Sequence, residues 1–282
     1  MYHIQIVGAG YTGSRIAAYF RTKKQKVWGL VRSGQSRAVL EKAGIVPVIA
    51  DLARPESLKT IPPAHFIVIS PAPSEGERGE AGYRRLYLEG IGNYLEAVRA
   101  HPRPNLLVYL SSTSVYGERG GEWVDEDTPP APDTEKGKIL LAAEEQVLSS
   151  GFPAIVFRLG GIYGPGRNGI ERLRRGEINS DGADKYLNHI HVEDIAGAMP
   201  VLFNRGEAGK IYLGVDDEPV KRSEMIRWLC GKLGIPEPAA VFSSKEIKGR
   251  RLSNKRLKSL GYAFKFPSYR EGYEDILCAA TF

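Results

Sequence analysis

A glycine-rich turn near the start of the chain has the residue types and spacing of a phosphate-binding loop. It reads Gly8-Ala9-Gly10-Tyr11-Thr12-Gly13 and stands between an apolar segment, Ile4–Val7, and an apolar helical pattern. Gly8 permits a tight turn, Gly10 lets the backbone approach a pyrophosphate, and Gly13 lets the helix pack closely, while the helix N-terminus attracts the phosphates. A mere tight turn is the alternative interpretation. The strand–turn–helix context favours a dinucleotide bound by Gly8, Gly10, Tyr11, Thr12 and Gly13.

The end of the second predicted strand, Val31-Arg32-Ser33, bears on which dinucleotide is bound. NAD sites of this type place an Asp or Glu here, about 20 residues after the glycines, to hold the ribose hydroxyls. This position carries Arg32, followed by Ser33, with no acid nearby in the sequence. A guanidinium suits a dianionic 2′-phosphate, so Arg32 and Ser33 favour NADP(H), with NAD(H) as the less favoured cofactor. A solvated surface arginine is the alternative interpretation.

Two further segments follow predicted strands, at the edge where ligands of open α/β sheets lie. Asp51 is placed to accept a hydrogen bond from an adenine amino group, and Leu52 to pack on the adenine face. Capping a turn is an equally good interpretation of Asp51. Ser70, Pro71 and Ala72 follow the next strand, and we expect them to contact the cofactor as well.

A hydroxyl-rich run, Ser111-Ser112-Thr113-Ser114-Val115-Tyr116-Gly117, follows the fifth predicted strand. With the glycine turn and three later motifs, it resembles the extended and atypical short-chain dehydrogenase/reductases, often called NAD-dependent epimerase/dehydratases. The later motifs are Arg158-Leu159-Gly160-Gly161-Ile162-Tyr163-Gly164-Pro165-Gly166, His191-Val192-Glu193-Asp194-Ile195-Ala196 and Ser253-Asn254-Lys255-Arg256-Leu257. The resemblance runs nearly end to end.

In that family a Ser or Thr near the start of the hydroxyl-rich run hydrogen-bonds the substrate oxygen. The resemblance therefore implies this catalytic role for Ser112 and places Ser111 beside the cofactor. A Tyr-x-x-x-Lys pair on the next helix relays the proton: the tyrosine is the acid or base, and the lysine lowers its pKa and holds the nicotinamide ribose.

The chain departs from the family at this pair, because no tyrosine occurs between Tyr116 and Tyr163. In one alignment register, Thr134 stands at the position of the family's tyrosine. Lys138 then stands at the position of the family's lysine, where it is expected to contact the cofactor. Lys136 stands at the tyrosine position in the other register, which is anchored on Ala142-Ala143-Glu144 and loses both residues. We predict that the standard chemistries are absent or very slow, and Tyr116, Tyr163 and Lys138 remain open as substitutes.

His191 and Asp194 open a helix that borders the substrate cleft in the family. The favoured alternative is structural, with Asp194 capping the helix N-terminus and His191 packed.

Placing these motifs at one edge requires strands and helices that alternate along the chain. Buried strands are predicted at Ile4–Val7, Lys26–Val31, Val46–Ala50, Phe66–Ser70, Leu106–Ser111 and Ala154–Arg158, and helices at Arg15–Thr22, Ser36–Lys42, Tyr83–Arg99 and Lys138–Ser149. The alternation predicts an α/β fold, with a doubly wound, Rossmann-type parallel sheet and a second, smaller C-terminal lobe.

After residue 165 the alternation of predicted strands and helices becomes less regular. We predict a loop or lid over Gly164–Asn188 with a short helix at Ile170–Arg175, a helix at Val192–Phe203, a strand at Lys210–Val215 and a helix at Pro219–Leu233. The Rossmann domain would comprise residues 1–165 plus 192–215, and the substrate lobe residues 166–191 plus 216–282. The substrate is expected in the cleft between them.

Composition is that of a globular protein, with 42% hydrophobic and 26% charged residues in 282. Apolar runs are too short to span a bilayer, and no signal-peptide pattern precedes the first strand, so we expect a cytoplasmic protein without a membrane partner. Cys230 and Cys278 are isolated, which suits a reducing compartment. No Cys/His cluster has zinc-ligand spacing, so no metal is predicted.

Part of the net charge of +6 lies in a late basic cluster, which consists of Lys245, Lys248, Arg250, Arg251, Lys255, Arg256 and Lys258. It suits a solvated face or an anionic small molecule. No aromatic residue interrupts the cluster and no nucleic-acid motif accompanies it, so we predict no nucleic-acid partner.

Two functional classes remain open. The first is an NADP-linked oxidoreductase or epimerase-like enzyme, with Ser112 polarising a carbonyl of an unidentified small-molecule substrate, for which an anion is one option. The second is a non-catalytic dinucleotide-binding redox sensor or regulator. The resemblance also implies a homodimer through the helices at Tyr83–Arg99 and Lys138–Ser149.

Overall fold

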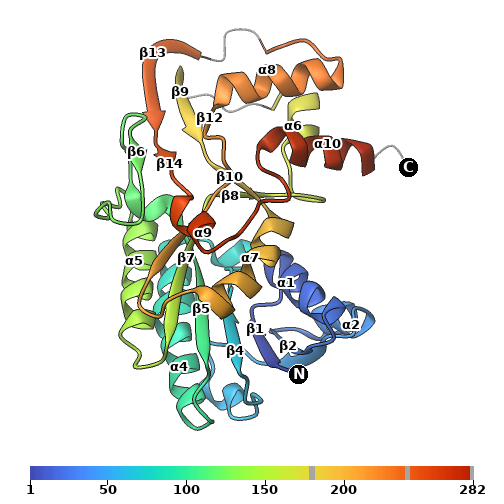
Figure 1. Cartoon of the computed structure of the whole chain (residues 1–282), viewed down its shortest axis with the longest axis vertical. Coiled ribbons are helices and arrows are strands. Elements are labelled where there is room, and N and C mark those ends of the chain that lie inside the picture. Colours follow the sequence, from blue (N-terminus) through green and yellow to red (C-terminus); the bar gives the residue numbers. More distant parts are fainter. Residues whose placement is uncertain (178–181, 239–241, 280–282) are drawn as a thin grey trace.

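A computed structural model of the chain describes residues 1–177, 182–238 and 242–279. A layered α/β domain occupies one end of the molecule, and a smaller lobe that contains α8, α10, β9 and β13 lies beyond one end of its sheet (Figure 1).

The central sheet is parallel throughout and has the strand order β11-β7-β5-β4-β1-β2-β3. Its strands are β1 His3–Val7, β2 Lys26–Val31, β3 Val46–Ile49, β4 Phe66–Ile69, β5 Leu106–Ser112, β7 Ala154–Leu159 and β11 Ile211–Gly214. All seven coincide with predicted strands to within two residues. The chain reverses its direction of travel across the sheet between β1 and β4, which makes a crevice at the strands' carboxyl ends.

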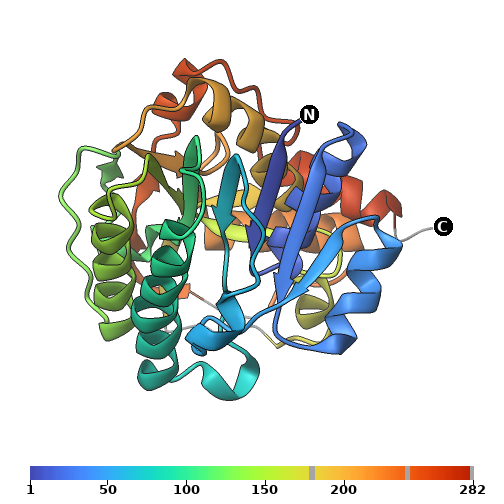
Figure 2. The same ribbon diagram turned by 90° about the horizontal axis from the view of Figure 1, so that it is seen from below.

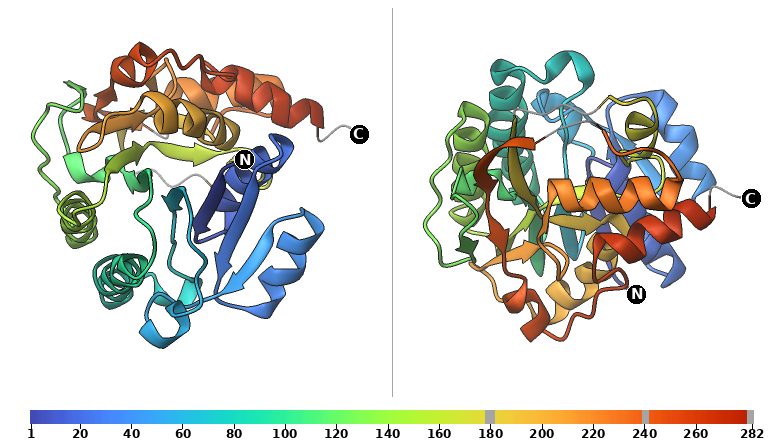
Figure 3. Two further views of the ribbon diagram at one scale, coloured as in Figure 1. Left: turned by 60° about the horizontal axis from the view of Figure 1, so that its bottom comes forward. Right: turned by 90° about the horizontal axis from the view of Figure 1, so that it is seen from above.

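Helices cover both faces of the sheet. One face carries α3 Glu80–Tyr83, the π-helical segment η3 Arg84–Gly90, α4 Ile91–Arg99 and α5 Glu135–Leu148; the other carries α1 Tyr11–Thr22, α2 Gly34–Lys42 and α7 Val192–Arg205. Short 3-10 turns occur at η1 Pro55–Leu58, η2 Glu75–Glu77 and η4 Thr113–Tyr116. The views along the sheet separate the two helical layers (Figures 2 and 3).

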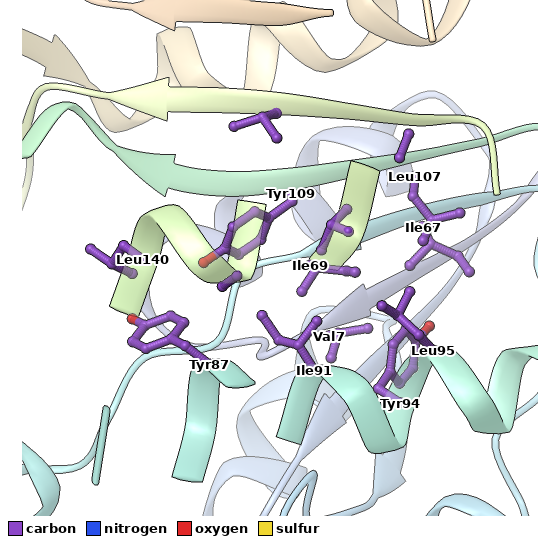
Figure 4. Packing of buried hydrophobic residues seen from close by; sticks show 14 of the residues in the cluster. Val7, Ile67, Ile69, Tyr87, Ile91, Tyr94, Leu95, Leu107, Tyr109 and Leu140 are labelled. Carbon is purple, nitrogen blue, oxygen red and sulfur yellow. The ribbon is translucent and has the colours of Figure 1, made fainter. Parts of the chain in front are cut away.

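Each buried strand supplies side chains to two cores, because successive residues point to opposite faces. In β4, Ile67 and Ile69 pack beneath η3, α4 and α5, whereas Phe66 and Val68 pack beneath the helices of the other face. Figure 4 shows Ile67 and Ile69 in the first core, beside Tyr87 and Tyr94. The purely apolar segments that predicted the strands are therefore strands covered on both sides.

α4 and α5 lie side by side on one face of the sheet (Figure 2). Gly92 of α4 faces α5, since a Cβ there would lie 2.6 Å from Nε2 at the end of the Gln146 side chain. The helical segment predicted from Tyr83 to Arg99 begins earlier, at Glu80, and contains the wide π-helical turns of η3. Such turns inside helices are frequent at functional sites, and η3 faces the crevice.

The smaller lobe is built from short strands and helices around its own apolar cluster, which includes Tyr163, Leu173, Met225, Leu229 and Tyr273. Its elements are β8 Gly161–Tyr163, α6 Ile170–Arg174, β9 Gly182–Leu187, β10 His189–His191, β12 Val220–Lys221, α8 Arg222–Leu233, β13 Phe242–Gly249 and α10 Tyr269–Ala279. Two further short elements, β14 Arg251–Leu252 and α9 Lys255–Ser259, return the chain to the sheet domain. There β14 pairs with β6 Trp123–Val124. Leu257 packs into the core between the sheet and the helices α1, α2 and α7.

Two predictions for this half are wrong in part. Gly164–Asn188 contains the short helix α6, but its end forms β9 rather than a loop; residues 178–181 lie outside the described ranges. β9 has little strand propensity of its own, and it pairs with β12 and β13, which come from much later in the chain. The helix predicted from Pro219 begins at Arg222, because Val220 and Lys221 pair with Leu187 and Tyr186 of β9.

Across the described ranges, none of the helices combines the length and apolar character that crossing a membrane requires.

Candidate functional site

A cleft of about 1280 Å³ follows the carboxyl ends of the sheet strands and passes between the sheet domain and the start of the lobe. It brings most of the predicted site residues together. Those that line it are Gly8, Gly10, Tyr11, Thr12, Arg32, Ser33, Asp51, Leu52, Ser70, Pro71, Ala72, Ser111 and Ser112. Gly13 and Lys138 are not part of the lining.

The glycine turn at the centre of the cleft is shaped by two close backbone contacts. A Cβ on Gly8, whose φ is +89°, would lie 2.6 Å from the carbonyl oxygen of Ser70, and one on Gly13 would lie 2.3 Å from that of Gly8. A Cβ on Gly10 would meet no described atom within 4 Å. Gly8 and Gly13 are thus required by packing, whereas Gly10 faces open space where a ligand can approach.

α1 begins directly after this turn, and no side chain caps its N-terminus among the described residues. Its first N–H groups are therefore left for an anion, and the helix dipole favours negative charge there. Arg167, which also lines the cleft, holds its guanidinium 5.5 Å from the ring centre of Tyr11, and the Tyr11 hydroxyl donates to the carbonyl oxygen of Pro165 at 3.2 Å. Both the backbone and the charges fit a pyrophosphate.

An acid does stand beside Arg32, contrary to the expectation from the sequence. Nη1 of Arg32 donates to Oε2 of Glu77 at 2.7 Å, and the hydroxyl of Ser74 donates to the same oxygen at 2.6 Å. Glu77 belongs to η2, on the segment that follows β4, so the partner comes from a different strand end. The hydrogen bond from Arg32, followed by that from Ser74, lowers the pKa of Glu77 to about 2.

Asp51 and Leu52 lie at the adjacent strand end. Oδ1 of Asp51 accepts a hydrogen bond from the backbone N–H of Ala53 at 3.0 Å, and Oδ2 lies 3.7 Å from Nε of Arg54. Asp51 therefore stabilises its own turn and also lines the cleft. The turn-capping interpretation of Asp51 is therefore confirmed, and its contact with an adenine amino group stays a prediction.

Several hydroxyl-bearing residues and one lysine line the same cleft beyond the glycine turn. Ser112 precedes η4, and its Oγ accepts from the backbone N–H of Ser114 at 3.2 Å, which leaves its own O–H free to donate. Thr134 caps α5 through a 3.1 Å bond from the N–H of Gly137. Lys136 lines the cleft two residues later. These groups can bind and polarise a carbonyl oxygen.

Lys136 lies against a phenol that the sequence did not single out. Its Nζ is 5.1 Å from the ring centre of Tyr83, and Tyr83 lines the cleft from the neighbouring helical segment. Lys138, two residues beyond Lys136, points elsewhere: its Nζ pairs with Oε1 of Glu135 at 2.6 Å, and 59% of its side chain is exposed. The register that puts Thr134 and Lys138 at the family's tyrosine and lysine therefore places only Thr134 in the cleft.

Ser111 has a structural partner beneath the cleft. Its hydroxyl donates to Oε1 of Glu144 at 2.5 Å, and Glu144 is paired with Arg158 in the core. The guanidinium of Arg158 in turn lies 4.8 Å from the ring centre of Tyr116. This network joins β5, α5 and β7 directly under the hydroxyl-rich end of the cleft.

Tyr116 and Tyr163, the two phenols that remained open as substitutes, are both buried and neither lines the cleft. Tyr163 stacks on Tyr273 in the core of the lobe. Burial raises the pKa of both groups, so neither is disposed to lose a proton.

The structural interpretation of His191 is confirmed, because its side chain is buried and packs against Phe266, but the expected cap by Asp194 is wrong. His191 is the residue that caps α7, since its Nδ1 accepts from the N–H of Glu193 at 3.3 Å. Asp194 instead binds the late segment: it accepts from the hydroxyl of Tyr262 at 2.7 Å and from the N–H groups of Lys265 and Phe266 at 2.7 and 3.0 Å. Both residues are buried structural groups outside the cleft lining. Burial lowers the pKa of His191 to about 4.

The late basic cluster is largely engaged within the protein. Two of its arginines bind backbone carbonyl oxygens: Arg250 donates to that of Thr113 at 2.6 Å and to that of Gly117, and Arg251 donates to that of Gly121 at 2.8 Å. Two other members form ion pairs: Arg256 with Asp127 at 2.6 Å and Lys258 with Asp217 at 2.9 Å. The side chain of Lys245 lies outside the described part of the structure.

Known proteins resemble the chain over between two thirds and all of its length. Protein YeeZ of Escherichia coli (strain K12) is 28% identical over 95% of this chain and 97% of its own. A 3-diazoavenalumate denitrifying reductase of a Streptomyces species is 28% identical over 67% of this chain and 70% of its own. The structure of a putative NAD-dependent epimerase/dehydratase from Methylobacillus flagellatus superimposes with a TM-score of 0.84 at 30% identity, covering 100% of this chain and 99% of the other.

The profile of the NAD dependent epimerase/dehydratase family matches residues 4–213, a span that contains the glycine turn, the hydroxyl-rich run and the strands of the central sheet apart from the first residue of β1 and the last of β11. The chain therefore belongs to the NAD dependent epimerase/dehydratase family.

Proposed function

We propose that the protein is an NADP(H)-dependent reductase that acts on a carbonyl group with a non-standard proton donor. One observation carries the proposal: a single cleft joins the glycine turn, the cation at Arg32 and the hydroxyl group of Ser112. A dinucleotide bound along it would place its adenosine end at Arg32 and its nicotinamide end at Ser112, because the pyrophosphate is fixed between them at Gly10.

Nicotinamide cofactors supply or accept a hydride. The chain's own residues would then bind and polarise the group that is reduced. Ser112 retains an O–H to donate to a carbonyl oxygen, and such donors are most effective where negative charge develops on that oxygen. Tyr83 and Lys136 are the proton-bearing groups at the same end of the cleft, and we assign the proton transfer to this pair.

The charges of the cleft favour an anionic substrate. Lys136, Arg78 and Arg167 all line it, and cations on the wall of a cleft raise the local concentration of anions. The reductase named among the relatives supports reduction over epimerisation or dehydration.

The test is a screen of NADPH consumption with purified protein against a panel of ketones, aldehydes and carbonyl acids. Cofactor affinity is measured in parallel by calorimetry. Binding together with turnover of at least one carbonyl acid supports a reductase. Failure of the protein to bind either dinucleotide would overturn the proposal.

Firm binding without any turnover would favour a redox sensor instead. One observation supports this second candidate: Lys136 occupies the cleft position that one register assigns to the family's tyrosine, while Tyr116 and Tyr163 lie outside the lining. A sensor should change conformation between its NADPH and NADP⁺ complexes, which limited proteolysis of the two complexes can detect.

A further inference from the structure

The pair formed by Arg32 and Glu77 lies where the ribose of a bound adenosine would stand. Arg32 and Ser33 follow β2, Asp51 follows β3, and Ser74 and Glu77 follow β4; all five residues line the same part of the cleft. The acid that NAD-binding relatives of this fold carry directly after the second strand is thus present here, but it comes from another loop.

Glu77 is held in place by several donors. One carboxylate oxygen accepts from Arg32 and from Ser74, at 2.7 and 2.6 Å, and the other lies 3.9 Å from Nη1 of Arg85. The low pKa of Glu77, about 2, keeps it ionised at any pH at which the protein would work. Glu77 is therefore a fixed negative charge beside the only cation that the sequence offers to a 2′-phosphate at the end of β2.

The pair has opposite consequences for the two cofactors. The 2′-phosphate of NADP(H) needs the guanidinium that Glu77 occupies, and it would stand beside a like charge. The free 2′-hydroxyl of NAD(H) can instead donate to the Glu77 carboxylate. Because 41% of the Arg32 side chain and 36% of the Glu77 side chain are exposed, the pair can separate without burying either charge, so exchange of its partner is feasible.

We propose that Glu77 is a specificity-determining residue, which competes with the 2′-phosphate for Arg32 and so restrains the preference for NADP(H) over NAD(H). This inference rests on the proposed binding of a dinucleotide in the cleft. In this proposal Arg32 favours binding of the 2′-phosphate and Glu77 opposes it at the same ribose.

The experiment measures the Kd of NADPH and of NADH by calorimetry for the parent protein, Glu77→Gln and Glu75→Gln. The Glu75 variant is the matched control, because it removes the same charge from the same short helix but from an exposed residue outside the cleft lining. Glu77→Gln should lower the Kd of NADPH about tenfold and raise that of NADH or leave it unchanged, because the glutamine amide keeps an acceptor oxygen but loses the negative charge. Glu75→Gln should change the ratio of the Kd of NADPH to that of NADH by less than twofold.

A second comparison isolates the competition for Arg32. In an Arg32→Ala background, Glu77→Gln should improve NADPH binding by a smaller factor, because no guanidinium remains to be released. An equal factor in both backgrounds would mean that Glu77 acts only by general repulsion and would overturn the proposal. So would an unchanged NADPH-to-NADH ratio in Glu77→Gln with both cofactors bound, a result that leaves the proposed function standing. Absence of binding by the parent protein would overturn both.

Discussion

Arg158 and Glu144 form an ion pair inside the core, with only 2% of each side chain exposed. Nη2 of Arg158 lies 2.7 Å from Oε2 of Glu144, and its Nε contacts both carboxylate oxygens at 3.1 Å. The pair ties α5 to β7, and α5 is the helix that begins at the cleft with Lys136. The buried pair thus helps to fix the position of the cleft residue Lys136.

Removal of one member of this pair should destabilise the fold strongly. Loss of one partner from a buried ion pair typically costs about 3–5 kcal/mol, because the other charge stays buried and uncompensated. We expect such a loss in the free energy of unfolding for Glu144→Leu, measured by urea denaturation. The double variant Glu144→Leu/Arg158→Leu should be less destabilised than the sum of the two single changes. Strict additivity would show that the two residues do not act as a pair.

Arg32→Ala should remove most of the preference for NADPH. The parent protein is expected to bind NADPH at least several-fold more tightly than NADH, since a charge-assisted hydrogen bond is worth about 1.5–3 kcal/mol. Calorimetric titration of both cofactors into both proteins measures the difference. Equal affinities in the parent protein would contradict the assignment of Arg32 to the 2′-phosphate.

Two glycine substitutions in the same turn should have different effects. Gly10→Val adds a branched side chain where no described atom lies within 4 Å, so the protein should fold normally and lose cofactor binding. Gly13→Ala should instead lower stability by about 1–3 kcal/mol, the usual cost of overpacking, because its Cβ would lie 2.3 Å from the carbonyl oxygen of Gly8. Thermal denaturation and calorimetry separate the two effects. Undiminished cofactor affinity in a folded Gly10→Val protein would show that the loop is only a turn and does not bind the pyrophosphate.

Turnover of ordinary sugar nucleotides, ketones and aldehydes should be absent or very slow despite firm cofactor binding. A general acid typically contributes about 10²–10⁴-fold, and the proposed donors, Tyr83 and Lys136, stand in the cleft instead of the family's Tyr-x-x-x-Lys pair, so only a substrate that suits them should react at an appreciable rate. Ser112→Ala should reduce any residual rate of NADPH oxidation, whereas Ser149→Ala, an exposed serine outside the cleft lining, should not. A rate of several turnovers per second on an ordinary carbonyl would contradict the expectation.

Mild acid should destabilise the protein through His191. Its pKa is about 4 in the fold because of burial, against 6.5 when exposed, so the unfolded chain binds the proton more tightly. Stability is therefore lost as the pH falls from about 6.5 towards 4, by about 2 kcal/mol at pH 5 from this group. Urea denaturation at pH 7 and pH 5 should show a smaller loss in His191→Asn, which retains a capping side chain. An unchanged pH dependence in that variant would exclude His191 as the cause.

Features encoded by neighbouring residues could be predicted from the sequence. The glycine turn depends on a strand, three glycines and a helix in immediate succession, and Ser112 lies at the end of its strand within a motif that resembles the family's, so both could be placed in the cleft in advance. The strands of the sheet were predictable because burial on both faces makes them apolar throughout.

Features created by distant residues could not be predicted in this way. Glu77 meets Arg32 across 45 positions of the sequence, and no local pattern shows that the loops after β2 and β4 converge. Tyr83 was identified only as the start of a helix, because its contact with Lys136 depends on the packing of two helical segments. β9 was missed for a related reason: its strand conformation is set by partners in β12 and β13.

Arg250 donates hydrogen bonds to the carbonyl oxygens of Thr113 and Gly117, so the two ends of the cleft are completed at different times during synthesis. These contacts span 137 and 133 positions, so during synthesis Ser112 leaves the ribosome long before Arg250 does. Chains fold from the N-terminal side as they emerge, and the glycine turn and its strands are complete early. The end of the cleft at the glycine turn can thus fold first, while the hydroxyl-rich end receives this support only after Arg250 has been synthesised.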